Sequence, residues 1–276
     1  MPGSEEVRGT GPKRVLNGRY RIGPSAGRWP YGEAALAADE WTYKTVVLKI
    51  VSPELHGGPG GLAGVRAWVE KLRAFKHASL PVIEDVFEDD GKLILVQERL
   101  EGERLSAFLG TGSQIQLPSA LVFLCQVAAG LDHAHAAGLV HGNLHPGNLL
   151  ITGTGSAKLF DFGLGLALRK ASPSGGGVIP EGTAYMAPEQ EHGEAVPASD
   201  LYSMAMILFQ MTTGRLPFED PGDWAVKRRL RLRSAGHLAP QLPVEFDGVV
   251  ARAFHPEPAG RYGACSEFIT ALERLT

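Results

Sequence analysis

The sequence has few of the features that mark secreted, membrane or nucleic-acid-binding proteins. Only two cysteines occur among 276 residues, and we expect Cys125 and Cys265 to be reduced, buried thiols rather than a disulfide framework. The net charge of −3 predicts no bulk attraction to nucleic acid or to a membrane surface. The chain does not open with a charged segment followed by an apolar one, so no secretory leader is expected. The longest apolar stretches, near 120–131 and 204–211, fall short of the roughly 20 residues of a membrane span.

What remains is the composition of an ordinary globular protein. Hydrophobic residues make up 44% and charged residues 21% of the chain, and the length fits one domain with two lobes. Residues 1–15 are rich in glycine, proline and charge, so we expect a flexible N-terminal tail there. The folded domain is expected over residues 16–276.

Short strand patterns dominate the first third of the chain. We predict strands over Tyr20–Ala26, Gly32–Asp39, Lys44–Val51, Val82–Phe87 and Lys92–Gln97, and a helix over Leu62–Lys76 after a loop at Gly57–Gly61. In the third strand, Lys49 shares one face with Val47 and Val51 because side chains alternate. A lysine between two apolar neighbours is unusual on a solvated strand.

After Gly102 the apolar period becomes helical. Leu121, Leu124 and Leu131 follow helical spacing, and the apolar pattern from Leu201 to Met211 predicts a buried core helix. Later helices are expected over Trp224–Arg233, Glu245–Phe254 and Cys265–Leu275. The fold class is therefore α+β, with a strand-rich N-lobe at about 16–98, a hinge at about 98–102 and a helical C-lobe at about 103–276. A cleft between two such lobes is a natural ligand site.

Four short motifs follow one another in order. Residues His141–Asn148 read HGNLHPGN, Asp161–Gly163 read DFG, Ala187–Glu189 read APE, and Asp200 opens the apolar helix. Together they resemble the eukaryotic-type protein kinase family, most closely its bacterial serine/threonine branch. The resemblance extends from about Leu16 to the end and implies a two-lobed kinase-like fold.

The resemblance also implies a site for ATP and Mg²⁺. Lys49 would hold the nucleotide phosphates, although a lysine reaching from an edge strand to water is the alternative. Asn148 and Asp161 would bind the metal, since both offer the hard oxygen ligands that Mg²⁺ prefers. The nucleotide would also be contacted by Gly27, Gly32, Val47, Glu98, Leu100 and Leu150.

The catalytic loop departs from the family pattern. Asn143 stands at the position of the aspartate base, and its amide oxygen cannot take up a proton at useful pH. His145 replaces the lysine two residues on, and it is mostly neutral near pH 7. We therefore expect impaired phosphoryl transfer, with His145 acting as a substitute base as the alternative.

Two further departures lie in the N-lobe. Trp68 occupies the place of the glutamate that pairs with the strand lysine, and Glu70 is expected to point away. Lys49 is then expected to lack its usual partner, with a rotated helix or pairing with Asp161 as the alternatives. The phosphate-binding hairpin has Trp29 and then Pro30 in place of its central glycine, so it offers fewer amide donors. Trp29 could lie on the surface or fold into the site.

Changes also affect the adenine slot and the activation segment. Val47 narrows the slot where a smaller alanine is usual, and Gln97 guards its back. The segment from 161 to 189 contains Ser172, Ser174 and Thr183. Gly142 replaces the arginine that would bind a phosphate there, so phosphorylation of the segment is not expected to switch this domain.

The parts that hold the fold are retained. The resemblance implies a column of Leu72, Ile83, His141 and Phe162 tethered to Asp200. It also implies an ion pair between Glu189 and Arg261 that supports the activation segment.

Weaker signals are a basic run and two histidines. Lys227–Arg233 reads KRRLRLR, which predicts a solvated helix face or a docking face for an acidic or phosphorylated protein. His133 and His135 lie on opposite faces of a helix and do not form a metal pair.

These residues support three hypotheses. The preferred one is a pseudokinase, a cytoplasmic regulatory or scaffolding module that binds protein partners. Binding of ATP and Mg²⁺ is left open in this hypothesis, with retained, weakened and absent binding as the alternatives. The alternatives are an active serine/threonine kinase with an atypical catalytic loop, and another transferase chemistry on the same fold. The chain is also consistent with one domain of a longer protein.

Overall fold

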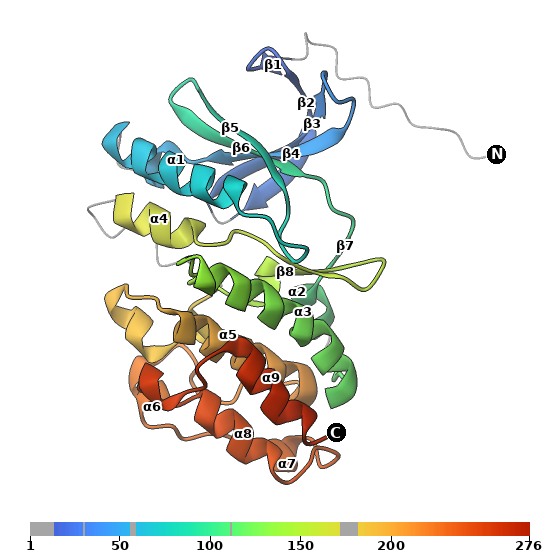
Figure 1. Ribbon diagram of the computed structural model, residues 1–276, viewed down its shortest axis with the longest axis vertical. Helices are drawn as coiled ribbons and strands as arrows, with labels where there is room; N and C mark the ends of the chain where they lie inside the picture. Colours follow the sequence, from blue (N-terminus) through green and yellow to red (C-terminus); the bar gives the residue numbers. More distant parts are fainter. Residues whose placement is uncertain (1–13, 30, 56–58, 111, 172–181) are drawn as a thin grey trace, which may run out of the picture.

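The chain forms two stacked lobes in the computed structural model, with the strand-rich lobe at the top of Figure 1 and the helical lobe below. The structure describes residues 14–29, 31–55, 59–110, 112–171 and 182–276. The predicted tail at 1–13, the loop residues 57 and 58, and Pro30, Ser172 and Ser174 lie outside the described residues. The protein-kinase-like α+β architecture is as predicted.

A six-stranded antiparallel sheet forms most of the N-lobe, in the order β1-β2-β3-β4-β6-β5. Its strands are β1 (Val15–Leu16), β2 (Tyr20–Trp29), β3 (Gly32–Asp39), β4 (Thr45–Val51), β5 (Ile83–Asp89) and β6 (Lys92–Glu98). β1 begins inside the predicted tail, since Val15 pairs with Arg21. β2 runs to Trp29, three residues beyond its predicted end, because Trp29 still pairs with Gly32 across the hairpin.

Helix α1 (Pro59–Ala74) packs across one face of this sheet (Figure 1). It starts within the stretch predicted as a loop and ends two residues before Lys76. Val65 and Val69 on α1 are buried against Val51 and Leu95 of the sheet. Burial of these apolar side chains holds the helix on the sheet and orients Trp68 toward the lower lobe.

The lower lobe is helical and begins at a small second sheet. This sheet contains β7 (Gly102–Arg104), β8 (Leu149–Thr152) and β9 (Ala157–Leu159). The helices are α2 (Leu105–Leu109), α3 (Leu117–Ala136), α5 (Pro197–Thr213), α6 (Trp224–Arg228), α7 (Ala235–Leu238), α8 (Phe246–Ala253) and α9 (Cys265–Glu273). The prediction of a helix through Arg233 is wrong, because α6 ends at Arg228 and Leu230 has a φ of +50°.

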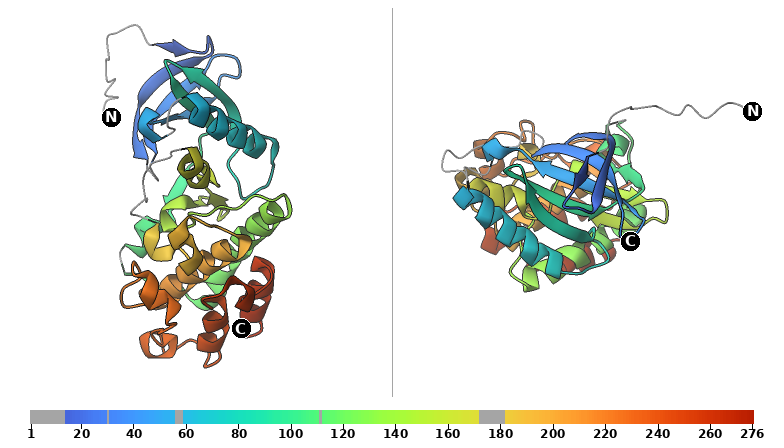
Figure 2. Two further views of the ribbon diagram at one scale, coloured as in Figure 1. Left: turned by 90° about the vertical axis from the view of Figure 1, so that its left-hand side faces the viewer. Right: turned by 90° about the horizontal axis from the view of Figure 1, so that it is seen from above.

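Helix α4 (Leu164–Ala171) was not predicted from the sequence and lies between the two lobes (Figure 2, left). It contacts α1. Its buried residues Leu164 and Leu168 pack into the apolar cluster of the N-lobe, although the segment follows C-lobe strands in the sequence. The start of the activation segment is therefore part of the N-lobe core.

Two buried helices hold the lower lobe together. α5 is buried along nearly its whole length, as predicted. α3 has 20 residues and is long and apolar enough to cross a membrane by length and composition, so the estimate that no stretch reaches that length is wrong. It packs against α5 and α9 in the core of the lobe. Cys265 is buried as expected, whereas Cys125 is only half-buried, and both are free thiols.

An ion pair ties the activation segment to the base of the lower lobe. The two terminal guanidinium nitrogens of Arg261 bond to the Glu189 carboxylate at 2.8 Å, as the resemblance implied. Arg261 also donates to the carbonyls of Ala198 and His255, and its side chain is 0% exposed. The Arg261 partner lowers the pKa of Glu189 against the opposing effect of burial.

Removing one partner of this pair should destabilise the fold strongly. Arg261→Ala leaves the Glu189 carboxylate without its cation, and breaking a buried pair in this way costs about 3–5 kcal/mol. Urea unfolding measures the loss. The exposed pair between Arg252 and Glu267, at 3.4 Å, provides the control. Arg252→Ala should cost at most about 1 kcal/mol, and equal losses in the two variants would contradict this account.

Candidate active site

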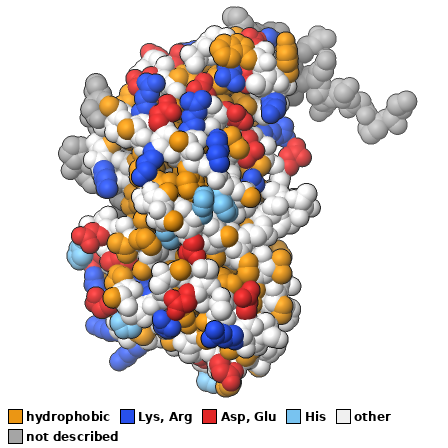
Figure 3. All heavy atoms as spheres, viewed as in Figure 1, with side chains coloured by type: hydrophobic (Ala, Val, Ile, Leu, Met, Phe, Trp, Pro, Cys, Tyr) orange, Lys and Arg blue, Asp and Glu red, His pale blue; other side chains and the backbone are white. Residues whose placement is uncertain are grey.

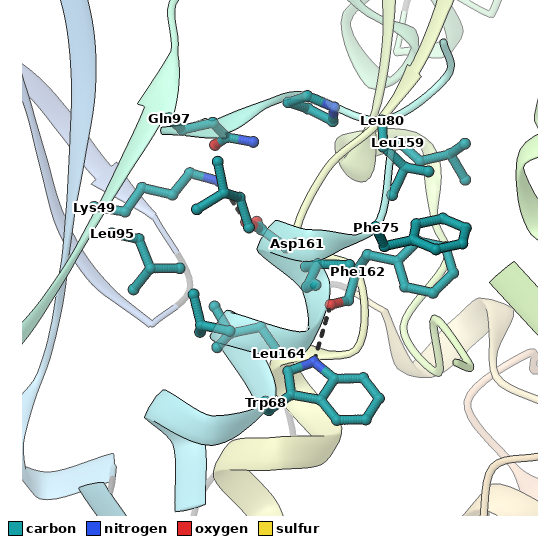
Figure 4. A pocket seen from close by; sticks show the side chains of 14 residues that line it. Lys49, Trp68, Phe75, Leu80, Leu95, Gln97, Leu159, Asp161, Phe162 and Leu164 are labelled. Atoms are coloured by element: carbon teal, nitrogen blue, oxygen red, sulfur yellow. Dashed lines mark hydrogen bonds and ion pairs between the residues drawn. The ribbon is translucent and has the colours of Figure 1, made fainter. Parts of the chain in front are cut away.

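Lys49 and Asp161 form an ion pair that joins the two lobes (Figure 4). Lys49 lies on β4 opposite Ala34 and Leu95, which places its side chain on the face turned toward the cleft. The two side chains are 8% and 6% exposed. The lysine therefore does not reach from an edge strand to water, and Asp161 is its partner.

Trp68 occupies the position where the family places a glutamate. Its indole nitrogen donates to the carbonyl of Phe162 at 3.4 Å (Figure 4). The indole also covers Gly163, where any Cβ atom would collide with it. Glu70 points away from the cleft as predicted, with its carboxylate 3.6 Å from Arg73 on the same helix. Trp68 thus holds the start of the activation segment, and Lys49 forms its ion pair with Asp161.

Asn143 lies buried at the position of the catalytic base. Its side-chain amide donates to the Tyr31 hydroxyl at 3.3 Å, and its backbone carbonyl accepts a bond from the Asn148 side chain at 3.0 Å. The Asn143 side-chain oxygen has no hydrogen-bond partner among the described residues. An amide oxygen at this position can orient a hydroxyl but cannot accept its proton.

His145 does not supply a base in place of Asn143. Its Nδ1 accepts a bond from the backbone amide of Gly147 at 3.2 Å, so the proton of the neutral ring is on Nε2. Burial lowers the pKa of His145 to about 4, and the ring is neutral near pH 7. Neither nitrogen is therefore free to take a proton from a substrate. The alternative role of His145 as a substitute base is not supported by this geometry.

Asp200 fixes the backbone of the catalytic loop. Its two carboxylate oxygens accept the backbone amides of His141 and Gly142, both at 2.8 Å. His135 bonds to the same carboxylate at 2.8 Å, while the ring of His133 lies against Phe75 on the other side of α3. The two histidines thus face different neighbours, as their spacing predicted. The loop is held in place whether or not it catalyses a reaction.

Gly142 provides space for helix α4. The residue has a φ of +67°, and a Cβ atom there would lie 2.5 Å from the Leu166 side chain. An arginine at this position would therefore collide with α4 where it now packs. The loss of the arginine and the position of the helix are sterically linked.

The hairpin between β2 and β3 brings aromatic side chains over the place predicted for phosphate. The ammonium of Lys49 lies 4.9 Å from the centre of the Trp29 ring, so the tryptophan folds into the site. Tyr31 packs edge-on against Trp29 and is 3% exposed. Gly27 is exposed at the bulged part of β2, and Gly32 is buried beside β4 with its φ at +154°.

A further aromatic side chain lies beside Lys49. Phe160, which sequence reasoning missed, is 8% exposed and lies under two cations. The Arg104 guanidinium is 4.9 Å and the Lys49 ammonium 5.3 Å from its ring centre. The position of Phe160 directly before Asp161 was the sequence signal that could have indicated its place in the cleft. Val47 on β4 and Leu150 on β8 come from the two lobes.

The predicted hinge residues have structural partners of their own. The Glu98 carboxylate accepts the amide of Val82 at 2.9 Å and lies 3.6 Å from Lys158. Leu100 is half-buried in the link between β6 and β7. Their predicted contact with a nucleotide stays a prediction.

The cleft offers oxygen atoms that suit a magnesium ion, but its hairpin obstructs the place of a triphosphate. Asn148 uses its amide nitrogen on Asn143, which leaves its side-chain oxygen for a metal, and Asp161 adds a carboxylate. Both residues therefore suit Mg²⁺. The phosphates, in contrast, would meet Trp29 and Tyr31, so a nucleotide requires this hairpin to move.

Lys227 corrects the interpretation of the basic run. Its side chain is fully buried, and its ammonium donates to the backbone carbonyls of Thr183 and Met186 at 2.8 and 2.7 Å. The lysine was expected on a solvated helix face but instead holds the end of the activation segment. Arg228, Arg229 and Arg231 are exposed.

Comparisons with known proteins agree with these observations. The protein kinase domain family matches residues 20–268. The serine/threonine-protein kinase PknA of Mycobacterium tuberculosis is 31% identical over 264 residues, covering 94% of this chain and 61% of that protein. A probable serine/threonine-protein kinase PknB of Bifidobacterium longum is 30% identical, covering 95% of this chain and 40% of that protein.

Solved structures show the same fold. The PknI kinase domain of Mycobacterium tuberculosis, in a mutant form, superposes with a TM-score of 0.77 at 24% identity, covering 96% of this chain and 98% of that one. This likeness concerns the fold alone. The chain spans 40 to 61% of the length of the two curated relatives named above.

The buried Lys227 should make stability depend on pH. Burial lowers the pKa of Lys227 to about 7, whereas an unfolded lysine titrates near 10.5. Between these values the unfolded chain binds more protons, so the unfolding free energy should rise with pH from about 7 to about 10. In Lys227→Met this contribution is lost. Urea unfolding at several pH values should show the unfolding free energy of the wild type rising relative to that of the variant as the pH increases. The exposed Lys92→Met is the control, and parallel pH profiles for all three proteins would contradict the prediction.

Proposed function

The chain belongs to the protein kinase family, and we propose that it is a catalytically impaired member, a pseudokinase. In this proposal it acts as a regulatory or scaffolding module that binds other proteins. Nucleotide binding is weak or absent in what we call the closed arrangement, in which Lys49 pairs with Asp161 and Trp29 and Tyr31 cover the place predicted for phosphate.

The observation that carries this proposal is the state of Asn143. An amide stands where a proton acceptor is needed, and its nitrogen is engaged by Tyr31. Loss of general-base catalysis alone costs about 10²–10⁴-fold in rate. His145 is neutral and has its free lone pair occupied by Gly147. The positive charge that would stabilise the moving phosphoryl group is therefore also missing from this position.

The closed hairpin supports weak or absent nucleotide binding. When bound, Mg²⁺ and ATP would supply the phosphoryl group and its charge neutralisation. Asn148 and Asp161 would hold the metal and Lys49 the phosphates. In the closed arrangement Lys49 faces the Trp29 ring and bonds to Asp161, so binding ATP requires both contacts to be exchanged.

The retained residues support one alternative. Lys49, Asn148 and Asp161 are the family's charged and oxygen-bearing groups, and the pair of Glu189 with Arg261 supports the activation segment. An atypical serine/threonine kinase could use them for electrostatic stabilisation, with Asn143 orienting the hydroxyl. Such an enzyme would need the hairpin and α4 to move first.

The partner in this proposal is a protein with an acidic or phosphorylated segment, met in the cytoplasm. The docking surface is smaller than the basic run indicated, because Lys227 is buried. It consists of the exposed Arg228, Arg229 and Arg231, of which Arg228 already pairs with Glu191. Figure 3 shows basic and acidic side chains interspersed on one face of the molecule, which does not favour nucleic acid as a partner.

Purified wild-type protein should show no phosphoryl transfer. We expect no labelling of itself or of a general substrate from Mg²⁺ and ATP, and little change in Tm. A tight nucleotide site would raise stability by about 2.7 kcal/mol at one hundred times Kd. Asn143→Asp should remain inactive, because Trp29 and Tyr31 still cover the site.

Asp161→Ala provides the control for contaminating kinases in these assays. Labelling by the wild type that disappears in Asp161→Ala would overturn the proposal. Activity gained in Asn143→Asp alone would show that the hairpin does not block the site.

Adding a side chain at Gly142 should release helix α4. Gly142→Ala places a methyl group against Leu166, and the φ of +67° adds a strain of about 1–2 kcal/mol. Backbone hydrogen exchange of residues 164–171, followed by mass spectrometry, should be faster in the variant.

Gly138→Ala is a matched control because Gly138 has the same φ of +67° but no described atom within 4 Å of the added Cβ. It carries the strain without the collision. If both variants changed exchange in α4 equally, the steric link between Gly142 and the helix would be wrong.

A further inference from the structure

Three side chains with different metal-binding atoms meet where helices α3 and α9 pack against each other in the lower lobe (Figure 1). Asp132 and His135 lie one helical turn apart near the C-terminal end of α3, and Cys265 is the first residue of α9. One ligand atom from each of the three residues lies within 4.8 Å of the other two. This cluster is separate from the cleft and from the residues predicted to hold Mg²⁺.

His135 has one ring nitrogen free for a metal. Its Nε2 lies 2.8 Å from the Asp200 carboxylate, and an ionised carboxylate only accepts, so Nε2 carries the proton of the neutral ring. Nδ1 then has a lone pair, and it has no hydrogen-bond partner among the described residues. Histidines that bind a metal through one nitrogen usually donate from the other to a carboxylate or carbonyl, which fixes the tautomer and the ring orientation.

The other two ligands are also fixed in place. The Asp132 carboxylate accepts the backbone amides of Cys265 and Ser266 at 2.8 and 2.9 Å, and each of its oxygens keeps a second lone pair. Cys265 is 1% exposed, whereas the His135 side chain is 10% exposed. The cluster is therefore held rigidly before an ion arrives, and it borders solvent on the side of His135.

From this geometry we propose that Asp132, His135 and Cys265 bind one Zn²⁺ ion, with a water molecule as the fourth ligand. Zinc accepts sulfur, nitrogen and oxygen ligands in a tetrahedral arrangement. Thiolate and imidazole ligands disfavour Mg²⁺ and Ca²⁺, which prefer oxygen alone. The carboxylate of Asp132 and the negative C-terminal end of the α3 dipole both favour a cation at this place.

Binding requires Cys265 as the thiolate. The thiol is protonated in the metal-free protein because burial raises its pKa, with the neighbouring carboxylates adding to the effect. A sulfur–zinc bond thus forms as the sulfur–hydrogen bond breaks, and the proton passes to solvent. No electron is transferred in this exchange.

The bound ion would join α3 to α9 and extend a network that already exists. His135 bonds to Asp200, which in turn accepts the backbone amides of His141 and Gly142. Zinc at Nδ1 would therefore fix the base of the catalytic loop from below. This inference goes beyond the proposed function and holds for a pseudokinase and for an active kinase alike.

Co²⁺ is a suitable probe because it occupies zinc sites and because its bonds to thiolate give a charge-transfer absorption band. We expect one equivalent of Co²⁺ to produce this band in the intact, reduced chain. Zn²⁺ should abolish the band by displacing cobalt, and excess Mg²⁺ should leave it unchanged.

The two cysteines provide a matched pair of variants. Cys125 also lies on α3 facing α9, where its thiol is 3.7 Å from Glu273, but it is not part of the cluster. Cys265→Ala should lose the cobalt band and Cys125→Ala should keep it. Because the chain has only two cysteines, a band in Cys125→Ala assigns the thiolate to Cys265 even where Cys265→Ala does not fold.

A variant of His135 tests the second ligand. His135→Gln keeps an amide donor for Asp200 but lacks the ring nitrogen. Its affinity for Zn²⁺, measured by competition with a chromophoric chelator, should fall about tenfold or more.

The inference is overturned if Co²⁺ gives no thiolate band with the wild type, or if the band is lost in Cys125→Ala. It is equally overturned if His135→Gln binds Zn²⁺ as tightly as the wild type. None of these measurements depends on phosphoryl transfer, so failure of the proposed function would leave a positive result standing.

Discussion

The arrangement of the cleft depends on the buried ion pair between Lys49 and Asp161. One residue comes from the N-lobe sheet and the other from the segment after β9, and both side chains are at least nine-tenths buried. A buried cation without a partner is strongly unfavourable, so the pair keeps the start of the activation segment against β4. The same two groups would be needed for phosphates and metal. The closed arrangement and a nucleotide-bound arrangement therefore compete for them.

The unusual residues around this pair fit one another sterically. Gly142 leaves room for Leu166, Gly163 leaves room for the Trp68 indole, and Asn143 meets Tyr31 from the hairpin. Each of these residues contacts or makes room for a neighbouring segment, so none of them is independent of its surroundings. Residues in contact have coupled effects on stability, so reversing one of them leaves the constraints imposed by the others. The substitutions at these positions and the packing of the hairpin and α4 across the cleft are thus two aspects of one arrangement.

Much of the fold could be predicted from the sequence because it depends on local patterns. Alternating apolar residues marked the strand that carries Lys49, and motif order placed Glu189 opposite Arg261. The burial of Lys227 could not be read from the run of basic residues, since it depends on carbonyls 41 and 44 positions earlier in the chain.

The contents of the cleft were the least predictable part. Helix α4 is short and is stabilised by N-lobe side chains distant in sequence, and a short helix has little intrinsic stability of its own. Periodicity carries no information on where a hairpin tip folds, so Tyr31 was missed, although its neighbour Trp29 was flagged with both its alternatives. The burial of a lysine and the folding of a hairpin over a site depend on tertiary contacts, which local sequence patterns do not predict.

The far end of the activation segment is held without phosphate. Lys227 bonds to the carbonyls of Thr183 and Met186, and Arg261 holds Glu189 a few residues later. Gly142 offers no guanidinium to a phosphorylated residue, so a phosphate on this segment would lack the partner that usually orders it. A phosphorylation switch between two ordered conformations of the segment would also have to break these existing contacts. The opposite end of the segment is held by apolar packing instead, since Leu164 is buried in the N-lobe cluster and the Trp68 indole lies against Gly163.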